Sequence, residues 1–254
     1  SELIRLNQEL LDKEMPSAAG PMAWIAQAYL DQGEYRKAEE WYGRALEIAP
    51  DAAAQHGLGT ALMRQKKYDP AGECLQKAKE AFHGAGDLSG EASSLSSLAA
   101  IDMLKSDNEA AAEKLQTIVE IMKSLGDVQG EAAALQEMAR LNLNKSDYDA
   151  ARPLLVRSLE LLEGAGDRMG AAFAIFNLAS LDLEKGDFQS AGAEYAKALP
   201  LFKEMGDRAG EAAILHSLGM IHSQAGEKEK AMESFRAALQ INQELADRPA
   251  EAGA

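Results

Sequence analysis

Two glycine-containing stretches are the residues of this chain that most resemble a nucleotide-binding loop. Gly84–Gly86 and Gly164–Gly166 have the pattern Gly-Ala-Gly, and each is followed by one more glycine, Gly90 or Gly170. A dinucleotide-binding loop needs the spacing G-x-G-x-x-G directly after a strand, so that backbone amides can approach the pyrophosphate. Here the third glycine comes one residue late, and the glycines follow a segment that favours helix. We therefore interpret both stretches as turns between helices, and we expect no cofactor.

Histidine and cysteine, which supply metal ligands and nucleophiles, are scarce and poorly spaced for either role. The chain has four histidines (His56, His83, His216 and His222) and one cysteine, Cys74. Two helical ligands share a face when they are three or four residues apart, but His216 and His222 are six apart. Acidic residues are abundant, yet nearly all fit solvated helix faces. The sequence therefore predicts no metal site, no catalytic residues and no enzymatic activity.

The composition excludes several kinds of partner. The 254 residues are 46% hydrophobic and 26% charged, and 41 acidic against 26 basic residues give a net charge of −15. Binding to nucleic acid needs a cationic surface, so a chain with this excess of acidic residues is not expected to bind it. No stretch approaches the roughly 20 apolar residues of a membrane helix, and the first residues lack the features of a secretory signal. We expect a cytoplasmic protein with neither nucleic acid nor membrane insertion among its interactions.

The elements that position these residues follow from an internal repeat. Gly-Asp occurs at residues 86–87, 126–127, 166–167 and 206–207, an interval of 40 residues, and a second break lies half a period away at residues 106, 146, 186 and 226. The two segments between breaks are rich in Ala, Leu, Glu and Lys, which favour helix. Glycine after a helix and aspartate before the next are typical end and start signals. Each repeat is therefore predicted to be a helical hairpin.

The hairpins share a pattern of small and large residues in six copies. A small residue recurs in the first helix at Ala26, Gly59, Ala99, Ala139, Ala179 and Gly219. An alanine recurs in the second helix at Ala38, Ala71, Ala111, Ala151, Ala191 and Ala231. A large residue follows at Tyr42, Leu75, Leu115, Leu155, Tyr195 and Phe235. Small residues let helix backbones approach closely, and such a face is buried only when neighbouring hairpins stack.

This pattern resembles the tetratricopeptide repeat family. The first repeat has the family's signature residues at Met22, Ile25, Ala26, Tyr29, Gly33, Tyr35, Ala38, Tyr42, Ala45 and Pro50. The 40-residue repeats are similar to those of cell-polarity adaptors and of some bacterial regulators. The resemblance implies an all-α fold, a right-handed superhelical solenoid of stacked helix-turn-helix hairpins. The later repeats depart from the family where it has an aromatic residue, at Asp102, Asn142, Asp182 and His222.

The repeat also sets the expected organisation of the chain. Six hairpins are predicted within residues 19–245, at about 19–51, 52–86, 87–126, 127–166, 167–206 and 207–245. Residues 1–18 are expected to form a capping helix or the second helix of an upstream repeat. Residues 246–254 are expected to be a tail that begins a degenerate or truncated repeat. Pro153 and Pro200 fall inside second helices, where we expect local bends because proline disturbs the helix interior.

The resemblance implies a concave groove lined by the first helix of each hairpin. The candidate binding residues on these helices are Trp24, Gln27, Met63, Arg64, Met103, Gln136, Arg140, Leu143, Phe173, Phe176, Asn177 and Met220. Aromatic and methionine side chains with few charges are typical of a protein-binding patch. Some family members hold a peptide carboxylate with cationic side chains at fixed groove positions. At the corresponding positions of this chain, only Arg140 is cationic. We therefore expect an amphipathic helix or an extended segment as ligand.

Three functions remain open at the level of the sequence. The leading hypothesis is a non-catalytic scaffold that binds a partner protein or peptide in the groove. Phe173, Phe176 and Met220 would then be apolar anchors, and Gln136, Arg140 and Asn177 would supply polar contacts. A homo-oligomer formed through the end repeats is the second hypothesis. A sensor or regulatory module cut from a larger multidomain bacterial protein is the third.

Overall fold

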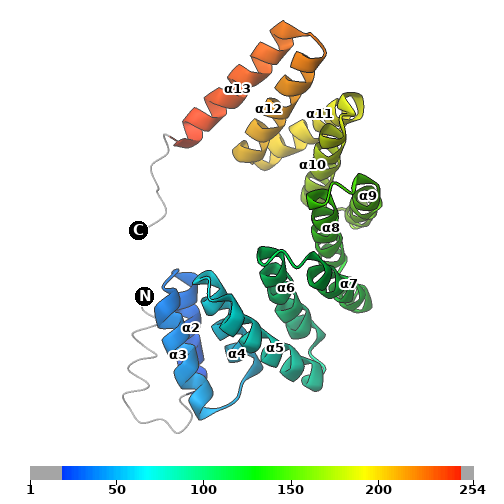
Figure 1. Cartoon of the computed structure of the whole chain (residues 1–254). Helices are drawn as coiled ribbons and strands as arrows, with labels where there is room; N and C mark the ends of the chain where they lie inside the picture. Colours follow the sequence, from blue (N-terminus) through cyan, green and yellow to red (C-terminus); the bar gives the residue numbers. More distant parts are fainter. Residues whose placement is uncertain (1–18, 247–254) are drawn as a thin grey trace. The chain divides into compact units, whose positions relative to one another are not determined.

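The computed structural model describes residues 19–246, which form helices joined by short turns, with no strand in that range (Figure 1). The helices are α2 (Ala19–Asp31), α3 (Tyr35–Ile48), α4 (Ala52–Arg64), α5 (Tyr68–Ala85), α6 (Leu88–Leu104), α7 (Asn108–Leu125), α8 (Val128–Asn144), α9 (Tyr148–Gly164), α10 (Arg168–Lys185), α11 (Phe188–Met205), α12 (Arg208–Gln224) and α13 (Lys228–Ala246). The expected N-terminal helix at 1–18, and the tail after Ala246, lie outside the described residues.

The helices pack as consecutive antiparallel pairs within two compact units that meet in sequence at Gly126 and Asp127. The N-terminal unit contains the hairpins α2–α3, α4–α5 and α6–α7, and the C-terminal unit contains α8–α9, α10–α11 and α12–α13. Inside each unit every helix contacts the next one along the chain, and first helices of neighbouring hairpins also touch, as α2 does α4 and α8 does α10. The predicted all-α class and the stacking of hairpins are confirmed.

The helix ends have the start and stop signals that the sequence contains. Asp51 precedes α4, and its carboxylate accepts a hydrogen bond from the Ala54 amide at 2.7 Å. The aspartates before the later helices make the same contact, at Asp87, Asp107, Asp127, Asp147, Asp167, Asp187 and Asp207. Such an N-cap satisfies an amide that has no partner inside the helix. Gly126 ends α7 with a φ of 68°, a left-handed conformation that glycine adopts at little cost.

The small residues of the repeat lie where helices approach most closely. Ala26 and Ala38 are fully buried in the first hairpin, and Tyr42 fills the space beside them. A Cβ atom on Gly59 would lie 2.6 Å from Cγ of Leu75, so alanine does not fit there without a shift of that side chain. The alternation of large and small residues therefore sets the distance between the two helices of a hairpin.

The second helices that follow α3 are about one turn longer than α3, and the additional turn wedges between hairpins. Helix α11 has 18 residues, whereas α3 has 14. The additional turn of α11 places Phe202, 1% exposed, against Gly210 of α12, where an added Cβ would come within 2.2 Å of the ring. Leu162 meets Gly170 in the same way at 2.7 Å. The glycine three residues after the aspartate of Gly-Asp, such as Gly170 or Gly210, is thus required for packing between neighbouring hairpins.

Pro153 and Pro200 do not interrupt the helices that contain them. Pro153 lies inside α9 and Pro200 inside α11, and both helices continue past the proline for several residues. Both prolines are exposed, so the carbonyl groups left without an intrahelical donor can bond to water. The expected bends stay a prediction.

The wedge contact makes a stability prediction for two glycines. Gly210→Ala should destabilise the chain by about 1–3 kcal/mol, because the new Cβ overlaps the Phe202 ring. Gly192→Ala is the matched control inside a helix, since its Cβ would meet Ile221 at an ordinary 3.6 Å. This change should stabilise the chain by up to about 1 kcal/mol through helix propensity alone. Urea unfolding followed by circular dichroism measures both, and an equal rise in both midpoints would contradict the packing argument.

Candidate functional site

The predicted groove residues are distributed over the first helices of both units. Trp24 and Gln27 lie on α2, Met63 and Arg64 on α4 and Met103 on α6, all in the N-terminal unit. The C-terminal unit has Gln136, Arg140 and Leu143 on α8, Phe173, Phe176 and Asn177 on α10, and Met220 on α12. The two sets are therefore two candidate surfaces, one on each unit.

The N-terminal surface contains a pocket of about 610 Å³, which we call the N-terminal pocket. Helix α2, the end of α3 and the start of α4 enclose it, and its lining residues are Ala19, Gly20, Ala23, Trp24, Gln27, Tyr42, Ala45, Ala49, Pro50, Asp51, Ala53 and Ala54. The Trp24 side chain is 66% exposed at this site, whereas tryptophan is highly buried on average. Asp51 is the single charged residue among those lining residues.

Gln27 joins the polar groups along the wall of the N-terminal pocket. Its side-chain carbonyl accepts a hydrogen bond from the Tyr42 hydroxyl at 2.8 Å, and its amide donates to Asp31 Oδ1 at 2.7 Å. Burial, and secondarily the negative charge of Asp31, raises the pKa of Tyr42 to about 12. Tyr42 is therefore a neutral donor at physiological pH, which fixes the direction of this chain of hydrogen bonds.

A second pocket of about 420 Å³ is lined by residues of α2, α4, α5 and α6. Gln27 and Ala53 line both pockets, and the second is completed by Leu30, Gly57, Thr60, His56, Phe82, Gly90 and Ser93. His56 Nδ1 lies 3.2 Å from the Ser94 hydroxyl, and burial lowers the pKa of this imidazole. His56 thus acts as a neutral hydrogen-bonding group. Met63, Arg64 and Met103 line neither of these pockets.

Residues from the second half of α3 and from the turn after it are the part of this site that the sequence did not reveal. Tyr42, Ala45, Ala49 and Pro50 line the N-terminal pocket, although only first helices were expected to line the groove. The available signal was the spacing from Tyr42 to Asp51, which is nine residues, whereas Tyr195 and Asp207 are twelve residues apart. A shorter second helix leaves the space beyond its end open, and its last residues become a wall.

The polar residues predicted in the C-terminal unit contact one another. Gln136 donates from its amide to the Ser158 hydroxyl at 2.9 Å, and it accepts from the Asn177 amide at 3.2 Å. These contacts tie α8, α9 and α10 together, so part of the hydrogen-bonding capacity of Gln136 and Asn177 is already used. Arg140 forms an ion pair with Glu137 on the same helix at 2.5 Å.

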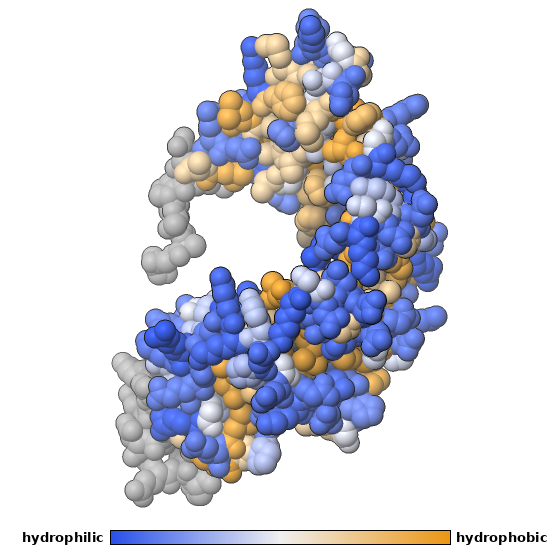
Figure 2. All heavy atoms as spheres, viewed as in Figure 1, coloured by the Kyte–Doolittle hydropathy of each residue, from blue (hydrophilic) through white to orange (hydrophobic). Residues whose placement is uncertain are grey.

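The apolar residues of the C-terminal unit differ in how much surface they expose. Phe176 is half-buried, with its ring 5.7 Å from that of Tyr195 and 5.8 Å from that of Phe202. Phe173 contacts Phe202 edge to face at 5.0 Å and is nevertheless 39% exposed, and Met220 is 38% exposed. Leu143 is half-buried in the cluster around Leu155. Figure 2 shows apolar side chains gathered over α12, whereas much of the surface over α9 is hydrophilic.

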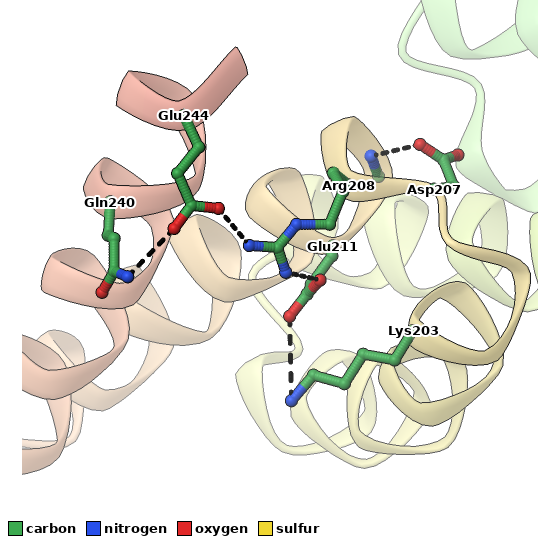
Figure 3. A network of polar contacts seen from close by, with 7 residues as sticks. Lys203, Asp207, Arg208, Glu211, Gln240 and Glu244 are labelled. Atoms are coloured by element: carbon green, nitrogen blue, oxygen red, sulfur yellow. Dashed lines mark hydrogen bonds and ion pairs between the residues drawn. The ribbon is translucent and has the colours of Figure 1, made fainter. Parts of the chain in front are cut away.

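Helix α12, which carries Met220, is fixed at its start by a network of charged groups (Figure 3). Arg208 donates to Glu211 Oε2 and to Glu244 Oε2, both at 2.6 Å. Glu211 is 6% exposed, and its other oxygen lies 3.8 Å from the ammonium of Lys203 on α11. The negative charge of the buried Glu211 is compensated by two cations, and the network joins α11, α12 and α13.

Side chains that form ion pairs or polar contacts occupy positions where the family usually has an aromatic side chain. Asp182, 1% exposed, forms an ion pair with Arg152 of the preceding hairpin. Asp102 pairs with Lys114 at 2.7 Å, and His222 contacts Glu227 at 2.8 Å. Burial, and then the charge of Asp182, raises the pKa of Glu194. The stability of the packing among α9, α10 and α11 therefore depends on whether the partly buried carboxyl group of Glu194 is protonated.

Among the described residues, possible metal ligands are not clustered and the one cysteine is partly buried. Among residues 19–246, no group of three histidine, cysteine or acidic side chains is arranged to hold a metal ion. Cys74 is half-buried, and burial raises the pKa of its thiol, which lowers the fraction of reactive thiolate. In the part of the chain that the structure describes, no helix is long and apolar enough to cross a membrane.

Family models described as tetratricopeptide repeat match residues 130–204, 170–244 and 23–51, together more than half of the chain. No curated protein sequence matches significantly. Among solved structures, a signal transduction ATPase with numerous domains and a tetratricopeptide repeat sensor, from Pyrococcus horikoshii, is similar at a TM-score of 0.75 and 16% identity. That match covers 97% of this chain and 41% of the ATPase.

Two further solved structures are similar over most of both chains. The apo form of RapI has a TM-score of 0.70 and 12% identity, covering 91% of this chain and 99% of RapI. A Rap protein complexed with competence and sporulation factor has a TM-score of 0.56 and 14% identity, covering 94% of this chain and 79% of that protein. At these identities the likeness establishes a shared fold.

The raised pKa of Glu194 predicts a pH-dependent stability. A raised folded-state pKa stabilises the fold fully below the ordinary value of 4.5, and this stabilisation is lost as the pH rises through the folded-state pKa. Glu194→Gln should therefore raise the urea midpoint at pH 7.5 and have little effect at pH 4. Glu233→Gln, at an exposed position, is the control and should change neither midpoint. A Glu194→Gln variant less stable than the parent at pH 7.5 would contradict the assignment.

Proposed function

Because the chain belongs to the tetratricopeptide repeat family, we propose that it is a non-catalytic cytoplasmic scaffold that binds a partner protein or peptide. Binding would use the exposed surfaces of the first helices, with Trp24 as the anchor of the N-terminal unit and Phe173 and Met220 as anchors of the C-terminal unit. The observation that carries this proposal is the exposure of these three large apolar side chains on first helices. Such side chains dominate the binding energy of protein interfaces.

The predicted residues have different roles in this proposal. Phe176 packs on Tyr195 and Phe202, and Phe202 also contacts Phe173, so Phe176 would support the anchor Phe173 through Phe202. Gln136 and Asn177 hold α8 and α10 in place and offer their remaining hydrogen-bonding positions to a ligand. Arg140, already paired with Glu137, would contribute at the edge of the surface. One similar structure, the Rap protein, is a complex with competence and sporulation factor, which is consistent with a ligand-binding role for this fold.

The experiment that tests the proposal compares apolar residues of equal exposure on two faces. Phe173→Glu combined with Met220→Glu should abolish capture of a partner from a lysate of the source cells, because it places charge on the proposed surface. Val156→Glu is the matched control, since Val156 is 38% exposed but lies on the second helix α9. Equal capture of the partner by the parent chain, the double variant and Val156→Glu would contradict a binding site on the first helices, provided circular dichroism shows the same helicity in all three.

Self-association through α13 is a second candidate function, favoured by the exposure of its outer face. Leu239 is 57% exposed and Met232 is 52% exposed. The residues equivalent to Leu239 in the two preceding hairpins, Leu199 and Leu159, are half-buried and pack in the cores. The outer face of α13 thus presents apolar groups of the kind that neighbouring hairpins cover. A second copy of the chain could cover them.

Light scattering across a concentration series tests this second candidate. If α13 mediates association, the mean mass should rise with concentration, and Leu239→Glu should return the chain to the monomer mass because it places a charge in the contact. Gln240→Glu changes the neighbouring exposed position and serves as the control. A constant monomer mass at high concentration would contradict self-association and leave partner binding unaffected.

A further inference from the structure

The N-terminal pocket lies where the other hairpins place a large apolar side chain of their own. Phe202 follows Tyr195 by seven residues and fills the space between α10 and α12, where it contacts Phe173 and Gly210. The residue seven positions after Tyr42 is Ala49, which comes just after the last residue of α3. The corresponding space between α2 and α4 therefore receives only a methyl group, and it is the pocket that Trp24 borders.

The filled copies of this space indicate what side chain the pocket accepts. The large residue is Phe82 in the second hairpin, Leu162 in the fourth and Phe202 in the fifth, and each is supplied by the last turn of a helix. Half of the residues that line the N-terminal pocket are alanine, and its volume of about 610 Å³ exceeds that of a single side chain. A helical segment with one phenylalanine or leucine and its flanking residues matches this space in shape and polarity.

The charged residues at the N-terminal pocket favour a positively charged group on its ligand. Asp51 is the one charged residue among those that line it, and Asp31 lies on the same helix as Trp24, held by Gln27. The exposed indole of Trp24 adds a face that attracts a cation. The chain as a whole carries a net charge of −15. A lysine or arginine on the ligand is therefore complementary to this site, and an acidic ligand is repelled.

We propose that the N-terminal pocket binds a helical segment of a partner protein that inserts one phenylalanine or leucine between α2 and α4 and presents a lysine or arginine to Trp24 and Asp51. The segment would take the place of the helical turn that α3 lacks. This inference rests on the proposed scaffold function and adds the chemistry of the ligand. It concerns only the N-terminal unit, so it is independent of Phe173 and Met220.

The test uses the full chain with Trp41→Phe, which leaves Trp24 as the single fluorescent indole. The probes are three alanine-rich helical peptides: one with a phenylalanine flanked one turn away on both sides by lysine, one with alanine for the phenylalanine, and one with glutamate for both lysines. The first should give a saturable blue shift of Trp24 emission. The other two should bind at least tenfold more weakly, since each lacks one of the two recognised features.

A substitution that fills the pocket provides the second arm of the test. Ala49→Phe supplies a large side chain from the chain itself, so binding of the phenylalanine peptide should be lost. Ala85→Phe, at an exposed position near the end of α5, is the matched control and should bind as the parent does. Unchanged helicity in both variants shows that the fold is retained.

Three results would overturn this inference. These are equal binding of the three peptides, unchanged binding after Ala49→Phe, or Trp24 emission that is blue-shifted and protected from acrylamide before any peptide is added. The last would mean that the chain itself covers the pocket. If the peptides fail while Phe173→Glu with Met220→Glu still abolishes partner capture, the scaffold function stands and only the assignment of this pocket is wrong.

Discussion

The contact between a large side chain and a glycine of the next hairpin is the constraint on which much of the stack depends. Phe202 is buried against Gly210 because the last turn of α11 reaches between α10 and α12. The same ring supports Phe173 and Phe176, so the wedge that joins two hairpins also shapes the exposed surface of α10. Packing between hairpins and presentation of apolar groups to a partner are therefore linked in the C-terminal unit.

The first hairpin shows what happens where this wedge is missing. Helix α3 ends at Ile48, the chain continues in extended conformation through Ala49, and the space between α2 and α4 stays open. Tyr42 and Gln27, which line this open space, are joined by a hydrogen bond. Variation in the length of one helix thus changes a packed junction into a pocket, without any change in the repeat pattern of the core.

Much of the fold could be predicted from the sequence, because helix starts, helix ends and small core residues recur at fixed spacing. Individual side-chain roles could not be predicted in the same way. Phe173 and Phe176 lie on the same helix three residues apart, yet one is partly exposed and the other packs on Tyr195. Gln136 and Asn177 contact each other across two hairpins, 41 residues apart, a pairing that no local pattern encodes. The N-terminal pocket could not be predicted either, because it exists only where α3 ends at Ile48.

The central claim is that partner binding uses the first helices of the hairpins. Photo-crosslinking tests it most directly, with benzoylphenylalanine incorporated singly at Trp24, at Phe173 and at the second-helix position Val156 in the source cells. The account predicts a crosslinked partner from position 24 or 173 and none from 156. Crosslinks that form from position 156 but from neither first-helix position would contradict it and would move the binding surface to the second helices.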